Sequence, residues 1–157
     1  MIASVSGKVL ASTLGAVTVE VGGVGLTVNT TSRISSSIGI GNQVTLMTVL
    51  VVREDSLTLY GFLDFMELET FDLLRSVNGV GPKSALSILS SLTVNEVADA
   101  VASESDAVFK SVTGVGPKTA KLITLSLAGK LPWGSASAAS KSSSRTSVDA
   151  LIGLGYT

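Results

Sequence analysis

Two residue types that carry much of enzyme and metal chemistry are missing from this chain. Its 157 residues include no cysteine and no histidine, and only one tryptophan, two tyrosines and four phenylalanines. Disulfides, cysteine or histidine metal ligands, and histidine general bases are therefore excluded. There is also no Gly-x-x-x-x-Gly-Lys-Ser/Thr loop for a nucleotide. We expect a protein without catalytic residues, cofactor or metal site.

Charge is scarce as well. Charged residues make up 15% of the sequence, and the formal net charge is −1. A protein that coats nucleic acid with a wholly basic surface would be far more positive. The acidic residues gather at 64–72 and 96–106, whereas Lys83, Lys118 and Lys121 follow glycine turns. One face can therefore be positive although the total is not.

No stretch of the chain is suited to a membrane. The longest uncharged segment is 34–52, and only 44–52 of it is apolar, which is strand length rather than a bilayer span. The N-terminus has no basic start and no cleavable apolar run. We expect a cytoplasmic protein with no membrane partner.

The most informative feature is a repeat. Residues 74–85 return as 109–120, at an offset of 35 residues, with a basic residue, Ser-Val, a polar residue, Gly-Val-Gly-Pro-Lys, a hydroxyl residue and Ala in both copies. Such a match at a fixed offset indicates an internal repeat. The candidate binding residues are Asn78, Gly79, Val80, Gly81, Lys83 and Ser84 in the first copy, and Thr113, Gly114, Val115, Gly116, Lys118, Thr119 and Lys121 in the second.

Each copy predicts a glycine turn between two helices. Glycine permits positive φ and close backbone approach, and the proline falls where a helix accepts it most easily, at its first position. The valine should point inward, leaving backbone N–H groups and a lysine at a helix N-terminus, which suits phosphate. A packing turn alone would need no ligand, but it would not need an exposed lysine either.

The rest of the chain predicts an α+β, multi-domain protein. Strands are expected at 3–10, 16–21, 26–30, 44–52 and 57–62, with a short helix at 32–38. Five strands in this length favour a closed OB-type β-barrel, with an SH3-like barrel or a meander as alternatives. Helices are expected at 65–77, 82–92, 94–103, 107–112 and 117–130. Phe65 is expected on the apolar face of the first, Thr93 to Glu96 has the form of a capping box at the start of the third, and Asp106 can cap the fourth. The predicted units are a barrel (1–62), a helical domain (63–132), a flexible Ser/Ala-rich linker (133–147) and the start of a further helix (148–157).

Glu54 and Asp55 lie in a turn between two apolar strands, and we call them the acidic tip. The turn could simply be solvated. A metal-dependent nuclease site would need more carboxylates, and the barrel offers only Glu20 besides. A third interpretation is electrostatic: beside a phosphate-binding surface, fixed negative charge repels DNA backbone and selects which DNA structure fits.

The Gly-Val-Gly turns resemble the helix-hairpin-helix motif of DNA repair proteins. Together with Met-Ile…Gly-Lys-Val at the N-terminus, the turn at 20–25, the segment 51–62 and the tail Ala-Leu-Ile-Gly-Leu-Gly-Tyr, the chain resembles the RuvA family. The resemblance covers 1–132 and 148–156. It implies a non-catalytic homotetramer, or two tetramers face to face as an octamer, that binds Holliday junction DNA.

The same resemblance assigns roles to the motifs. The paired hairpins would grip the backbone of each arm from the minor groove, and the acidic tip would be the pin at the junction centre, with two carboxylates from each of four chains. The ATPase RuvB would be the motor, recruited by a third domain of which 148–157 are the truncated start, and the resolvase RuvC would be a further partner.

The chain departs from the family pattern at several positions. Pro117 and Leu122 stand where the second hairpin commonly has cations, and Leu26 stands where a tyrosine often follows the turn. Three other functions remain to be compared with junction binding: a helix-hairpin-helix repair module without junction selectivity, a helix-hairpin-helix enzyme, and a protein-interaction module whose hairpins only pack helices.

Overall fold

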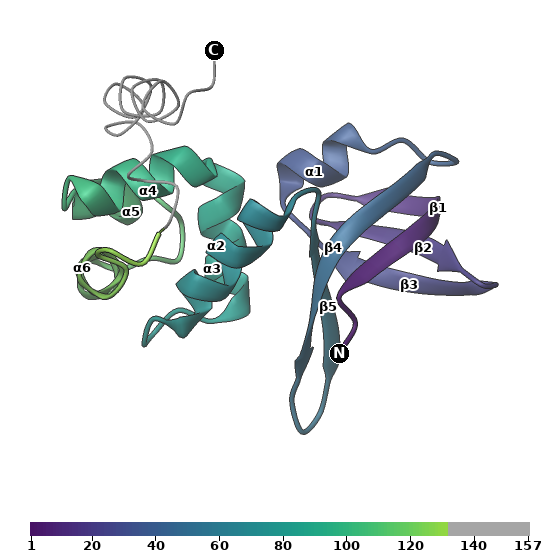
Figure 1. The fold of residues 1–157 in the computed structure, drawn as a ribbon, viewed down its shortest axis with the longest axis horizontal. Helices are drawn as coiled ribbons and strands as arrows, with labels where there is room; N and C mark the ends of the chain where they lie inside the picture. Colours follow the sequence, from purple (N-terminus) through teal and green to yellow (C-terminus); the bar gives the residue numbers. More distant parts are fainter. Residues whose placement is uncertain (132–157) are drawn as a thin grey trace, which may run out of the picture.

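The computed structural model describes residues 1–131, and it begins with a closed five-stranded barrel (Figure 1). The strands are β1 (Ser4–Thr13), β2 (Ala16–Val21), β3 (Val24–Asn29), β4 (Gln43–Val52) and β5 (Leu57–Phe62). Their order around the barrel is β1-β2-β3-β5-β4, with β4 pairing back to β1 and β3 parallel to β5. This closure confirms the OB-type barrel and excludes the meander.

Alternation along the strands fills the barrel with aliphatic side chains. The buried interior residues include Val5, Val9, Val17, Val19, Val28 and Leu46. Gly7 on β1 allows a close crossing, because a Cβ there would lie 1.9 Å from the carbonyl oxygen of Glu20 on β2. The short helix α1 (Ser32–Ser37) follows β3, and the side chain of Thr31 caps it by accepting from the Ile34 N–H.

Within residues 1–131, five helices follow the barrel. They are α2 (Phe65–Ser76), α3 (Pro82–Ser91), α4 (Val94–Ala102), α5 (Asp106–Lys110) and α6 (Pro117–Ser126). Figure 1 shows them as a bundle beside the barrel, with α2 following directly from β5. The predicted capping box at the start of α4 is confirmed, since Thr93 accepts from the Glu96 N–H and Glu96 accepts from the Thr93 N–H.

Some expected boundaries and side-chain positions were wrong. The β2–β3 turn is only Gly22-Gly23, both at positive φ, so β3 begins at Val24 rather than at 26. Asp106 does not cap α5 but is its first residue, and α6 ends at Ser126 rather than at 130. Phe65 was placed on the apolar face of α2, yet it is 61% exposed, because α2 starts at the edge of the bundle.

Contacts on two sides join the barrel to the bundle, and they include a hydrogen bond of 3.4 Å from the Ser32 N–H on α1 to the Ser90 hydroxyl on α3. On one side, the rings of Tyr60 and Phe62 on β5 each lie 5.1 Å from the ring of Phe71 on α2, measured between centroids. On the other, Arg33 on α1 donates to the carbonyl oxygens at the end of α3, at 2.7 Å to Leu89 and 3.4 Å to Leu92. The orientation of the bundle is therefore fixed at two separate points.

Within residues 1–131 no single helix is long and apolar enough to cross a membrane; only α3 and α4 taken together, bent by 98° between them, pass by length and composition. The predicted linker (133–147) and the predicted helix start (148–157) lie outside the described residues.

Candidate nucleic-acid interface

The first repeat copy forms the turn between α2 and α3, which we call hairpin 1. Val77 donates its N–H to the Leu74 carbonyl at 3.1 Å, and Val80 donates to the Val77 carbonyl at 3.0 Å. Gly79 has a φ of +89°, a conformation that side-chain-bearing residues rarely adopt. Val80 is 5% exposed, so the predicted inward valine is confirmed.

Hairpin 2, between α5 and α6, repeats this geometry at the same offset. Val112 donates to the Phe109 carbonyl at 3.1 Å, and Val115 donates to the Val112 carbonyl at 3.2 Å. Gly114 has a φ of +90°, and Val115 is 7% exposed. The sequence repeat is therefore also a repeat of backbone hydrogen bonds.

The two turns expose helix N-termini that no side chain caps. Gly81 and Gly116 are the N-cap residues of α3 and α6, both extended and both without a side-chain cap. Proline at the first position has no N–H, so the first free donors are the amides of Lys83 and its neighbour, and of Lys118 and its neighbour. Uncapped amides beside a lysine form a site for an anion with several oxygens, such as phosphate.

The structure distinguishes two kinds of cation in the repeat. The basic residue before each turn is held in a local ion pair, Arg75 with Asp72 at 2.7 Å and Lys110 with Asp106 at 3.0 Å. The exposed lysines after the turns, Lys83, Lys118 and Lys121, form no ion pair within the described residues. Their charge is available to an external anion.

The hairpins lie close together but differ in packing. A Cβ on Gly79 would lie 3.5 Å from the Thr119 hydroxyl, so hairpin 1 borders the start of α6. Pro82 is buried, whereas Pro117 is exposed. Hairpin 1 therefore packs against neighbouring structure, and hairpin 2 is more exposed to solvent.

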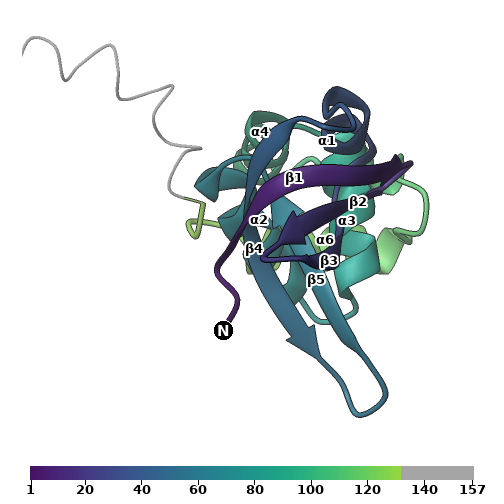
Figure 2. The ribbon, with the colours of Figure 1, turned by 90° about the vertical axis from the view of Figure 1, so that its right-hand side faces the viewer.

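The acidic tip lies at the end of a two-stranded ribbon that extends away from the barrel (Figures 1 and 2). The Arg53 N–H donates to the Ser56 carbonyl at 2.9 Å and closes the turn, leaving Glu54 and Asp55 exposed. No group of three or more acidic side chains in residues 1–131 could hold a metal ion. The carboxylates act here as fixed surface charges.

A groove of about 450 Å³ joins this ribbon to hairpin 1. Asp55 and Arg53 line it on the ribbon side, and Gly81, Lys83 and Ser84 line it on the hairpin side. The structure therefore brings the acidic tip and hairpin 1 together, although Asp55 and Gly81 are 26 positions apart in the sequence. Arg53 was not among the candidate residues; its place in the charged turn was the signal that could have found it.

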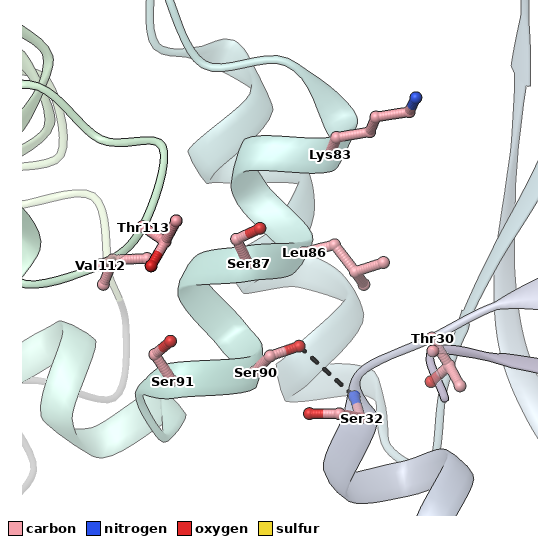
Figure 3. Close-up of a pocket in the computed structure, with 10 residues that line it drawn as sticks. Thr30, Ser32, Lys83, Leu86, Ser87, Ser90, Ser91, Val112 and Thr113 are labelled. Carbon is pink, nitrogen blue, oxygen red and sulfur yellow. Dashed lines mark hydrogen bonds between the residues drawn. The ribbon is translucent and has the colours of Figure 1, made fainter. Parts of the chain in front are cut away.

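A second groove, of about 380 Å³, follows α3 from hairpin 1 toward the barrel (Figure 3). Lys83 borders both grooves, and Thr113 of hairpin 2 borders this one. Ser87 and Ser91 on α3 also line it and were missed in the sequence. Ser87 lies four residues after Lys83 and Ser91 four residues after Ser87, a spacing that places all three on one helix face and could have revealed them.

A closed OB-type barrel followed by two hairpins of this geometry defines a tandem helix-hairpin-helix protein. The family model for the RuvA N-terminal domain matches residues 1–61, and the model for a SAM-like helix-hairpin-helix tandem matches residues 71–128.

Three similar proteins share the name Holliday junction branch migration complex subunit RuvA. The one from Clavibacter sepedonicus is 49% identical over 99% of this chain and 75% of its own length. The one from Thermobifida fusca is 40% identical over 99% of this chain and 82% of its own length. The one from Leifsonia xyli is 48% identical over 83% of this chain but only 63% of its own length. The chain belongs to the RuvA family.

Proposed function

We propose that this protein binds four-way (Holliday) junction DNA, independently of sequence, as the non-catalytic scaffold of a branch-migration complex. The observation that carries the proposal is the arrangement of three elements around shared grooves. Two hairpins of equal geometry present lysines that form no ion pair within the described part of the chain, and an acidic tip faces one of the hairpins. Phosphate attraction and phosphate repulsion are thereby placed side by side.

The hairpins supply the grip on the arms. Their uncapped amides and the lysines at positions 83 and 118 contact backbone phosphates, which carry no sequence information. Hairpin 1 is the stronger contact, because it is packed from behind and lies beside both grooves. Lys121 supplies a further cation near hairpin 2, on the first turns of α6.

The acidic tip supplies the discrimination. Two unit charges about 4 Å apart interact by roughly 4 kcal/mol at an effective dielectric constant near 20. A continuous duplex that crossed the ribbon would bring phosphates against Glu54 and Asp55 and would be repelled. A four-way junction is open at its centre, so its arms can lie on the hairpins while the tip occupies the crossover as a pin.

The proposed partners come from the resemblance to the RuvA family. A homotetramer matches the four arms of the junction, one chain to an arm, and two tetramers would enclose it as an octamer. The scaffold itself breaks no bond, so a separate ATPase of the RuvB type moves the DNA, and a resolvase of the RuvC type acts on the same junction. The names of the relatives, each a subunit of a branch migration complex, support a multi-protein assembly.

A gel-shift competition at moderate salt tests the proposal, with a four-way junction against duplex DNA of the same arm sequence. Strong preference for the junction is expected. Equal affinity would mean that the hairpins bind backbone in any duplex, as in a helix-hairpin-helix repair module, and the role of the acidic tip would be withdrawn. If the wild-type protein bound neither DNA, the interpretation in which the hairpins only pack helices would be favoured.

A further inference from the structure

The ribbon that carries the acidic tip has two unlike faces. Its strand register pairs Val51 with Thr58 and Val52 with Leu57. Because successive residues of a strand point to opposite faces, these two pairs lie on opposite sides of the ribbon. Val51 and Thr58 line the groove shared with hairpin 1. Val52 and Leu57, which we call the apolar pair, lie on the other face.

That other face continues the interior of the barrel. The next pair on the same face, two residues closer to the barrel on each strand, is Leu50 with Leu59, and Leu59 is 8% exposed. Neighbouring strands do not follow the ribbon to its end: β1 pairs with β4 only as far as Met47, and β3 pairs with β5 only at Leu59 and Tyr60. The ribbon beyond these positions is two-stranded, as Figure 2 shows.

The apolar pair is therefore left in solvent. Val52 is 65% exposed and Leu57 is 72% exposed. Folding gains little from apolar side chains in this position, where polar β-branched residues would support the strands equally well. Exposed strand ends usually carry charged or polar residues that discourage association. An exposed apolar pair directly behind a charged turn points instead to a ligand with an apolar surface.

The surrounding charges limit which ligand that is. The carboxylates of Glu54 and Asp55 adjoin the pair and repel phosphate, while Lys83 lies along the groove on the opposite face of the ribbon and attracts it. Nucleic acid that meets this ribbon must keep its backbone on the Lys83 side and bring something uncharged to the apolar pair. The faces of the bases are the uncharged, apolar part of nucleic acid.

We propose that Val52 and Leu57 contact nucleobases at the crossover of a bound junction and hold the base pairs beside it apart. Proteins that deform DNA often insert an apolar wedge of this kind between base steps, where it replaces part of the lost stacking. The apolar pair is the wedge, and the acidic tip keeps the backbone away from it. The inference rests on the proposed function, and it adds base contact to phosphate repulsion.

Fluorescence of 2-aminopurine tests the wedge. The full chain is mixed with an immobile four-way junction that carries 2-aminopurine next to the crossover, since emission of this base rises when it is unstacked. The test variant is V52T with L57T, which keeps strand-forming side chains and inserts a hydroxyl in each. The matched control is V21T with V24T, because these valines are also cross-strand partners at a turn and are 37% and 58% exposed.

We expect emission to rise on binding of the wild type and of the control, and most of this rise to be lost with V52T/L57T. Binding of that variant in the gel shift should persist, because the hairpins keep their phosphate contacts. Undiminished emission with V52T/L57T would overturn the wedge and leave junction binding intact. Equal binding of junction and duplex by the wild type would overturn both proposals. If light scattering without DNA showed a smaller assembly for V52T/L57T than for the wild type, the apolar pair would be a contact between chains, and the wedge would be overturned.

Discussion

Loss of the unpaired lysines should change how DNA binding depends on salt. Each phosphate that a protein neutralises contributes roughly −0.9 to the slope of log affinity against log salt. Lys83 and Lys118 form no ion pair within residues 1–131, so each is free to neutralise one phosphate. K83A and K118A should each make the slope shallower by about 0.9 for every engaged chain, and the double variant by about 1.8.

The same slope predicts how far the variants fall below the wild type in affinity. A fourfold rise in salt weakens binding about 3.5-fold for each phosphate contact, so the difference in affinity between wild type and variant is smaller at high salt than at low salt. Fluorescence anisotropy titrations with one labelled duplex at several salt concentrations measure the slope. K130A is the matched control, since Lys130 is exposed but lines neither groove. Unchanged slopes in K83A and K118A, or an equal change in K130A, would refute the assignment of the hairpins.

Four further outcomes are expected. E54Q with D55N should raise duplex binding relative to junction binding in the gel-shift competition, and unchanged duplex binding would contradict the pin. R33A should lower the free energy of unfolding by about 1–2 kcal/mol in urea titrations, since a charged donor loses carbonyl partners in a partly exposed site; full stability would show that the Arg33 hydrogen bonds do not hold the barrel to the bundle. G79A should lower the free energy of unfolding by about 1–2 kcal/mol because its φ is +89°, and G25A is the control, since Gly25 has no positive φ and an added Cβ would meet only side-chain carbons at 3.4 and 3.6 Å. Burial raises the pKa of Glu67; the native state then holds a proton that the unfolded chain has released, so stability falls as pH rises between the two pKa values, and E67Q should remove this fall.

The hairpins could be predicted from the sequence because their geometry is local. Glycine spacing, the valine between the glycines and the following proline determine a turn within a few residues, and both copies have the expected form. The capping box at Thr93 was predictable for the same reason. Features that depend on three or four neighbouring residues leave a direct trace in the sequence.

Which charges of the interface are available to DNA could be predicted only in part from the sequence. Arg75 and Lys110 occupy the same place in the two copies, and the sequence alone does not say that their charges are neutralised while those of the later lysines are free. The acidic partners lie three residues before Arg75 and four before Lys110, and that helical spacing was a usable signal.

The grooves could not be predicted, because they arise from packing between distant segments. Arg33 reaches carbonyl oxygens that lie 56 and 59 residues further along the chain. The groove between the acidic tip and hairpin 1 depends on the angle between barrel and bundle, which no local pattern encodes. The exposed apolar pair is visible only once the ribbon is known to extend past its neighbouring strands.

Under the proposed function, these non-local contacts make α3 the element on which junction selectivity would depend. It begins at hairpin 1, one face lines the second groove, and the carbonyl oxygens at its end accept from Arg33. A helix of ten residues is about 15 Å long, so a tilt of about 6° at one end moves the other by roughly 1.5 Å. Hydrogen bonds to phosphate tolerate only a few tenths of an ångström around 2.9 Å, so such a tilt breaks them. Under the proposed function, residues that line neither groove, such as Arg33 and Phe71, would contribute to selectivity by fixing the distance between the acidic tip and hairpin 1.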